Sequence, residues 1–171
     1  MNYKKSLNNL VKIKCSRYTE VDEIIINEAT KLGLPLIGGT ALEILASAYN
    51  IPGVRKRSDN DIDVIAYDLD TLNSFIKKSK EILKQHNLTA EDVKIDAYLT
   101  DKNIVKNFSF KVDGVLLMKP EWLLHSKLVR GTDKDIKWLL KIPQMTDDDI
   151  NYALDTLGVT TEEFELLTSL L

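Results

Sequence analysis

The spacing of apolar residues along the chain changes several times between a helical and a strand period. Residues 19–32 and 70–86 repeat apolar positions three and four apart, which predicts two amphipathic helices. A short apolar run at 35–37 predicts a buried strand. A capping-box pattern opened by Thr40 then predicts a helix over about 40–49. Helices and strands are therefore expected to alternate in this part of the chain.

Three later segments predict further strands. Residues 61–67 form an apolar run with acidic residues at its start, and residues 93–99 alternate between apolar and polar positions. One face of this second segment carries its polar and aromatic residues: Lys94, Asp96 and Tyr98. Residues 108–118 predict a hairpin that turns near Asp113 and Gly114.

From Pro120 onward the pattern is helical, and Gly131 and Gly158 predict interruptions. Three threonines with an acid three positions later predict helix N-caps: Thr132, Thr146 and Thr160. The order of elements predicts an α/β (α+β) fold, a small mixed sheet flanked by helices. We expect an α/β core over residues 1–118, which includes the N-terminal helix, and a C-terminal helical region over 119–171.

Composition narrows the class of protein. The 171 residues are 44% hydrophobic and 29% charged, as in soluble globular domains. No apolar run approaches the roughly 20 residues that span a bilayer, and residues 1–17 carry lysines without the apolar core of a secretory signal. The single cysteine excludes an internal disulfide and suits a reducing compartment. The sequence thus favours a cytoplasmic protein with no membrane partner.

Charge is unevenly distributed, although the net charge of −3 does not by itself indicate nucleic-acid binding. Residues 119–141 contain six basic and three acidic residues, whereas residues 142–171 contain seven acids and no lysine or arginine. Either of two arrangements explains this pattern: two solvated helix faces of different charge, or a basic surface that faces phosphates. The leucine-rich end of the chain packs either on the core or on a partner protein.

The candidate chemistry begins with Gly38-Gly39, where the predicted strand 35–37 runs into a helix. A glycine turn at a helix start brings backbone N–H groups close to phosphate, and the Thr40 hydroxyl adds a further donor. We expect Gly38, Gly39 and Thr40 to hold the phosphates of a nucleoside triphosphate. Glycine is also used at such turns for backbone reasons alone.

Three aspartates complete the candidate site. Asp61 and Asp63 lie two residues apart on a predicted strand, so that both carboxylates project from one face. Asp96 lies on the polar face of a later strand and is the expected third carboxylate. Hard oxygen ligands favour Mg²⁺ or Mn²⁺, and three carboxylates could hold two such ions for an in-line displacement. Asp96 could also accept the proton of an attacking hydroxyl. The alternative is that these residues are ordinary surface acids.

These residues carry a resemblance to known proteins. Gly38-Gly39-Thr40, then Asp61-Ile62-Asp63, then Asp96, resembles the DNA polymerase beta-like nucleotidyltransferase superfamily. The sequence Gly-Gly-Thr-Ala-Leu, with Arg57 four residues before the first aspartate, resembles its abortive-infection (AbiEii-type) toxin-like branch. The segment 120–128, which contains Lys127, and the later pair Lys134-Asp135 are also similar to that branch. The resemblance covers roughly residues 34–140.

The resemblance implies a transferase that moves a nucleoside monophosphate from a triphosphate to a hydroxyl, with pyrophosphate as the leaving group. The acceptor would be a tRNA end, a protein hydroxyl or a small molecule, and the setting a toxin–antitoxin system. Lys127 would contact triphosphate oxygens as part of the catalytic machinery. Arg57 would contact phosphate or order its loop. The alternative is a non-catalytic, antitoxin-like module that retains the fold and binds another chain.

Overall fold

The strands expected from the sequence form one mixed sheet. The computed structural model describes residues 19–51, 61–129, 136–141 and 147–169. Its strands are β1 (Leu36–Ile37), β2 (Asp61–Ala66), β3 (Lys94–Leu99), β4 (Ser109–Val112) and β5 (Val115–Met118). They are ordered β3-β2-β1-β5-β4. β2 is antiparallel to β1 and parallel to β3, and β1 is parallel to β5. β3 and β4 therefore form the two edges.

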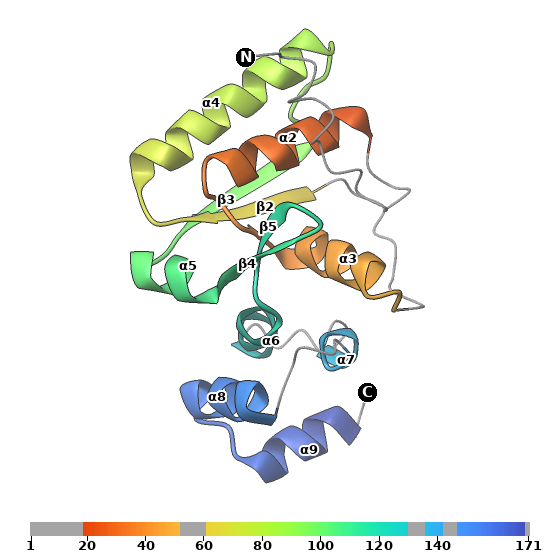
Figure 1. Ribbon diagram of the computed structural model, residues 1–171, viewed down its shortest axis with the longest axis vertical. Coiled ribbons are helices and arrows are strands. Elements are labelled where there is room, and N and C mark those ends of the chain that lie inside the picture. The colour runs from red at the N-terminus through yellow and green to blue at the C-terminus, as the bar shows by residue number, and fades with distance from the viewer. Residues whose placement is uncertain (1–18, 52–60, 130–135, 142–146, 170–171) are drawn as a thin grey trace.

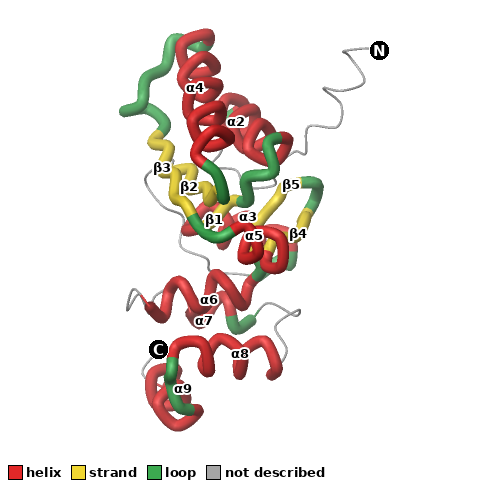
Figure 2. The backbone as a smooth tube through the Cα atoms, turned by 90° about the vertical axis from the view of Figure 1, so that its left-hand side faces the viewer, coloured by secondary structure: helices red, strands yellow, loops and turns green. Residues whose placement is uncertain are grey.

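Helices lie on both sides of this sheet (Figure 1, Figure 2). On one side, α2 (Glu20–Lys31) and α4 (Leu69–Gln85) lie against each other. On the other side lie α3 (Gly38–Ala48) and α5 (Lys102–Phe108). α5 is short and was not expected from the sequence; the Asp101 side chain caps its first turn by accepting from the Asn103 N–H.

The C-terminal helices form further layers below the sheet (Figure 2). They are α6 (Pro120–Val129), α7 (Ile136–Leu139), α8 (Asp147–Leu157) and α9 (Thr161–Ser169). α6 packs against α7 and α8, and α9 packs against α8. From the leucine-rich end, Phe164 is buried and Leu166 is exposed. None of the helices in the described ranges is long and apolar enough to cross a membrane.

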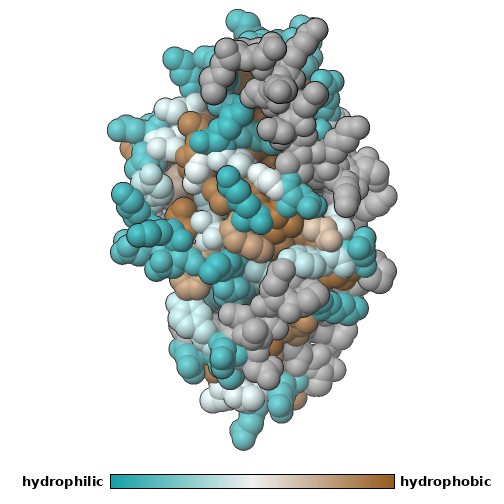
Figure 3. All heavy atoms as spheres, viewed as in Figure 1, coloured by the Kyte–Doolittle hydropathy of each residue, from teal (hydrophilic) through white to brown (hydrophobic). Residues whose placement is uncertain are grey.

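One hydrophobic core joins the sheet to the first C-terminal helices. Ile62 and Val64 of β2 are fully buried, and Leu124 of α6 and Leu139 of α7 belong to the same cluster. On the face shown in Figure 3, hydrophilic residues cover much of both ends, and the largest apolar area lies near the middle of the molecule. The core thus extends across the boundary expected near residue 119.

The start of α3 corrects one expectation. The helix begins at Gly38 rather than Thr40, and its N-cap is Ile37, which makes no side-chain capping hydrogen bond. Gly38 has a φ of +66°, so the chain turns directly from β1 into the helix two residues early. The capping-box interpretation of Thr40 and Glu43 was therefore wrong, because Thr40 already lies inside the first turn.

Two other local predictions are confirmed. The hairpin between β4 and β5 turns at Asp113 and Gly114, whose φ values of +48° and +83° are those of a type I′ turn. Thr160 caps α9 by a reciprocal pair of hydrogen bonds with Glu163. The predicted caps at Thr132 and Thr146, and the predicted interruption at Gly131, lie outside the described residues.

Candidate functional site

The register between β2 and β3 brings the three aspartates onto one face of the sheet. In β2, the side chains of Asp61 and Asp63 alternate with the buried Ile62 and Val64. In the parallel pairing, Asp63 lies directly opposite Asp96. Residues directly opposite each other in neighbouring strands project to the same face. The carboxylates of Asp61, Asp63 and Asp96 therefore share a face.

Gly38 closes one side of this carboxylate cluster. Ile37 is paired with Asp63 across β1 and β2, so the next residue, Gly38, lies beside the Asp63 side chain. A Cβ built on Gly38 would lie 2.2 Å from Asp63 Oδ2, which is far inside van der Waals contact. Glycine is thus required here both for its positive φ and for the space that the Asp63 carboxylate occupies.

Thr40 connects the start of α3 to β2. Its side chain is fully buried, and its hydroxyl donates a hydrogen bond to the backbone carbonyl of Asp61. The hydroxyl hydrogen is thus directed to the strand that carries the aspartates. Thr40 therefore fixes the first turn of α3, with the N–H groups of Gly38 and Gly39, against the Asp-x-Asp strand.

Lys94 is the site residue that sequence reasoning missed. Its Cα partner across the strands is Asp61, and its Nζ lies 2.8 Å from Asp96 Oδ2. The hydrogen bond from Lys94 to Asp96 is the main cause that raises the pKa of Lys94, and the charges of Asp96, Asp61 and Asp63 add to it. The alternation of residues 93–99 had already placed Lys94 and Asp96 on one face, which was the available signal.

The oxygen donors of this cluster are of the chemical type that a hard divalent cation prefers. Carboxylates from two adjacent strands face one side of the sheet, and the ammonium of Lys94 forms an ion pair with one of them, Asp96. In the part of the chain that the structure describes, no three His, Cys, Asp or Glu side chains are arranged to hold a metal ion. One oxygen of Asp96 is hydrogen-bonded to Lys94 instead. The metal site therefore stays a prediction.

The other two candidate residues are Lys127 and Arg57. Lys127 lies on α6, and its side chain is only 5% exposed. The helices that α6 contacts most are α7 and α8. The loop that contains Arg57 lies outside the described residues. Contacts of Lys127 and Arg57 with phosphate accordingly stay predictions.

The fold is similar to that of a solved viral polyadenylate synthase. The chain aligns with the crystal structure of the Megavirus polyadenylate synthase with a TM-score of 0.58 and 18% sequence identity. The alignment covers 84% of this chain and 37% of the viral protein, so the chain spans well under half of that protein's length. No protein-family model and no curated protein matches the chain.

This likeness shows the fold. The chain has a nucleotidyltransferase-like fold, a five-stranded mixed sheet flanked by helices. At 18% identity it carries no information on the abortive-infection branch, on the acceptor or on the metal.

Proposed function

We propose that this protein is a metal-dependent nucleotidyltransferase. The observation that carries the proposal is the placement of Asp61, Asp63 and Asp96 on one face, beside the glycine start of α3. The nucleotidyltransferase-like fold supports it independently. A nucleoside triphosphate is the donor, and a hydroxyl on a tRNA end, a protein or a small molecule is the acceptor.

Each residue has a proposed role in the transfer. Asp61 and Asp63, with Asp96, would hold Mg²⁺ or Mn²⁺, which when bound neutralises the triphosphate and stabilises the entering and leaving oxygens. The N–H groups of Gly38 and Gly39 bind phosphate oxygens at the start of α3. Asp96 accepts the proton of the acceptor hydroxyl. The oxygen of that hydroxyl bonds to the α-phosphorus, and pyrophosphate leaves. Lys127 and Arg57 would bind phosphate oxygens.

The experiment is transfer of label from α-labelled nucleoside triphosphates in the presence of Mg²⁺ or Mn²⁺, with and without total tRNA. The wild-type protein should transfer label or release pyrophosphate, and the double variant Asp61→Asn/Asp63→Asn should do neither. Asp148→Asn, an exposed acid on α8, is the matched control and should retain activity. No transfer by the wild type, together with no metal-dependent binding of any triphosphate in calorimetry, would contradict the proposal.

The Lys94–Asp96 ion pair also favours a second function. Three carboxylates repel one another in a protein that binds no metal, but the Lys94 ammonium offsets part of this repulsion. A non-catalytic, antitoxin-like module that binds another chain could therefore retain all three aspartates. This second function predicts that triphosphate binding is absent and that the double variant still binds the partner chain.

The finer assignment rests on the sequence resemblance alone. The segment 120–128 and the pair Lys134-Asp135 support membership of the abortive-infection branch and a toxin–antitoxin setting. A test is expression in a bacterial host. The wild-type chain should slow growth, and the Asp61→Asn/Asp63→Asn variant should not.

A further inference from the structure

The Lys94 ammonium lies against Asp96, one of the three carboxylates proposed to hold a divalent cation. The Nζ atom of Lys94 lies 2.8 Å from Asp96 Oδ2, at the distance of a charge-assisted hydrogen bond. Across the strands, Lys94 is paired with Asp61, and Asp96 is paired with Asp63. These two cross-strand pairs therefore bring one ammonium, that of Lys94, together with three carboxylates.

The same carboxylates act on Lys94 and would act on a metal ion. The Lys94 ammonium is hydrogen-bonded to Asp96 and lies across the strands from Asp61, which are two of the proposed metal ligands. An oxygen that accepts a hydrogen bond from an ammonium offers less of its charge to a second cation. Lys94 and a divalent cation therefore compete for Asp96.

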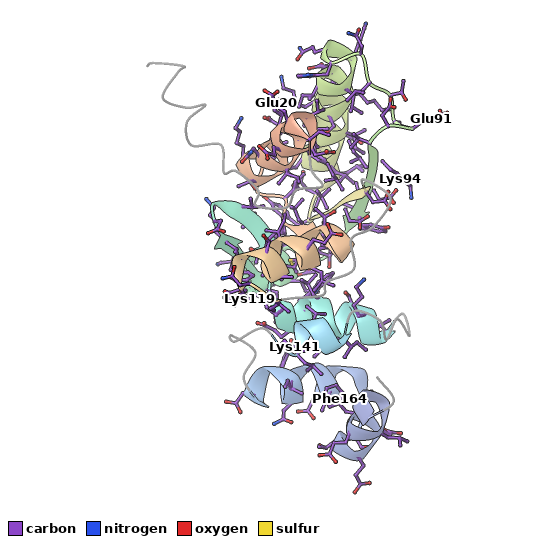
Figure 4. All side chains as sticks on the ribbon, turned by 90° about the vertical axis from the view of Figure 1, so that its right-hand side faces the viewer. Glu20, Glu91, Lys94, Lys119, Lys141 and Phe164 are labelled. Atoms are coloured by element: carbon purple, nitrogen blue, oxygen red, sulfur yellow. The ribbon has the colours of Figure 1, made fainter. Side chains whose placement is uncertain are left out.

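Lys94 is also placed where it can leave without disturbing the core. It is the first residue of β3, an edge strand, and its side chain is 62% exposed, against 32% for Asp96. Figure 4 shows Lys94 at the outer margin of the sheet. Movement of its side chain into solvent requires only rotamer changes, which are fast for an exposed lysine.

We propose that Lys94 is a displaceable internal cation: it holds the Asp96 carboxylate in the cluster before a divalent cation binds, and it leaves Asp96 when that cation arrives. This positioning role rests on the proposed function. Its consequence is that the wild-type protein binds divalent cations more weakly than its carboxylates alone would, because each binding event must also break the Lys94–Asp96 bond.

The test is the affinity for Mn²⁺ alone, measured by electron paramagnetic resonance and by calorimetry. Lys94→Met should bind Mn²⁺ about tenfold more tightly than the wild type, because one positive charge is removed from beside the ligands. Lys94→Arg retains the charge and should bind as weakly as the wild type. Lys111→Met is the matched control, since Lys111 is an exposed lysine on the opposite edge strand, β4; its affinity should be unchanged.

A second measurement follows Lys94 itself and needs no substitution. Acetylation of lysines in the native protein, read by mass spectrometry, should label Lys94 several-fold faster with Mg²⁺ present, while the labelling of Lys111 stays constant. This readout also covers the case in which Lys94→Met fails to fold.

The outcomes separate this inference from the proposed function. The inference would be overturned if the wild type and Lys94→Met bound Mn²⁺ with equal affinity, within twofold. It would also be overturned if the labelling rate of Lys94 did not change with Mg²⁺. Either result would leave the nucleotidyltransferase proposal standing. Absence of Mn²⁺ binding by every variant at millimolar concentration would overturn both. Loss of binding in Asp61→Asn/Asp63→Asn, with tighter binding in Lys94→Met, supports both.

Discussion

At the scale of single residues, the contact between Gly38 and Asp63 sets the geometry of the cluster. The positive φ of Gly38 lets the chain turn into α3, and the missing side chain leaves room for the Asp63 carboxylate. The two requirements can be separated by comparison with Gly33. That glycine has a similar φ of +73°, but nothing lies within 4 Å of a Cβ built on it.

Gly38→Ala should therefore cost more than Gly33→Ala. Gly33→Ala should lower the free energy of unfolding by about 1 kcal/mol, the cost of a left-handed backbone with a side chain. Gly38→Ala adds a clash with Asp63, typically a further ~1–3 kcal/mol, and should also weaken Mn²⁺ binding. Chemical denaturation and calorimetry measure both effects. Equal destabilisation by the two substitutions would show that the Gly38–Asp63 contact is not tight.

Thr40 allows a second prediction at this scale. Thr40→Val keeps the shape of the buried side chain but removes the hydrogen bond to the Asp61 carbonyl, and a buried acceptor without its donor costs about 1–3 kcal/mol. Thr40→Ser retains the hydroxyl and should lose less. Denaturation curves of the three proteins test this order. A serine variant as unstable as the valine variant would show that packing of the methyl group, rather than the hydrogen bond, matters here.

The sequence was sufficient to predict which face of its strand each residue lies on. It was not sufficient to predict which residue of the neighbouring strand that residue contacts. Strict alternation along each strand is enough to place Asp61 with Asp63, and Lys94 with Asp96, on shared faces. Which aspartate the lysine contacts depends on the register between β2 and β3, two strands separated by a helix, and no local pattern encodes that register. For this reason Lys94 was not recognised as part of the site.

At the scale of elements, long periodic segments were predictable and short or strained ones were not. α2 and α4 repeat an apolar stripe over many residues, and the structure places both close to the expected bounds. α5 has seven residues and a single buried side chain, too few for a period to be visible. α3 began early because a glycine with positive φ allowed it, which a capping pattern does not encode.

A histidine on one of the helices also predicts how stability depends on pH. Burial lowers the pKa of His125 on α6 below its ordinary value of 6.5. Well above pH 6.5 this histidine is neutral in both the folded and the unfolded state. As the pH falls through 6.5, the unfolded state binds the proton first, so stability falls. The wild type should lose stability between pH 7 and pH 5, and His125→Gln should flatten this part of the curve. Parallel curves for the two proteins would contradict the assignment.

A second loss of stability should occur at lower pH for a different reason. Hydrogen bonds from backbone N–H groups lower the pKa of Asp68 and Asp92 below 3.8, and that of Glu163 below 4.5. Carboxylates with lowered pKa stabilise the fold above these values, and their contribution is lost as they become protonated. This second phase should therefore remain in His125→Gln.

At the scale of the whole molecule, the continuous core bears on the division of the chain. The sequence suggested a boundary near residue 119, but Leu123 and Leu124 of α6 are buried in the same cluster as the strands. An interaction across such a boundary makes separate folding of the two parts unfavourable. The helical region is expected to stabilise the sheet rather than to act as an independent appendage.

Leu124→Ala tests this coupling. Truncation of a fully buried leucine should lower the free energy of unfolding by about 2–5 kcal/mol. If the regions fold together, circular dichroism and tryptophan fluorescence should report one transition, displaced to lower denaturant concentration. Two transitions, of which only one moves, would instead show that the C-terminal helices unfold on their own.

The position of β3 at the edge of the sheet has a consequence for self-association. An edge strand presents unpaired backbone groups that another chain can extend, and a charged side chain near the edge opposes this addition. β3 carries the exposed apolar residues Tyr98 and Leu99 at one end and Lys94 at the other. Lys94 thus opposes strand-to-strand aggregation at this edge, and Lys94→Met should scatter more light on concentration than Lys80→Met, which removes an exposed lysine from the helix α4.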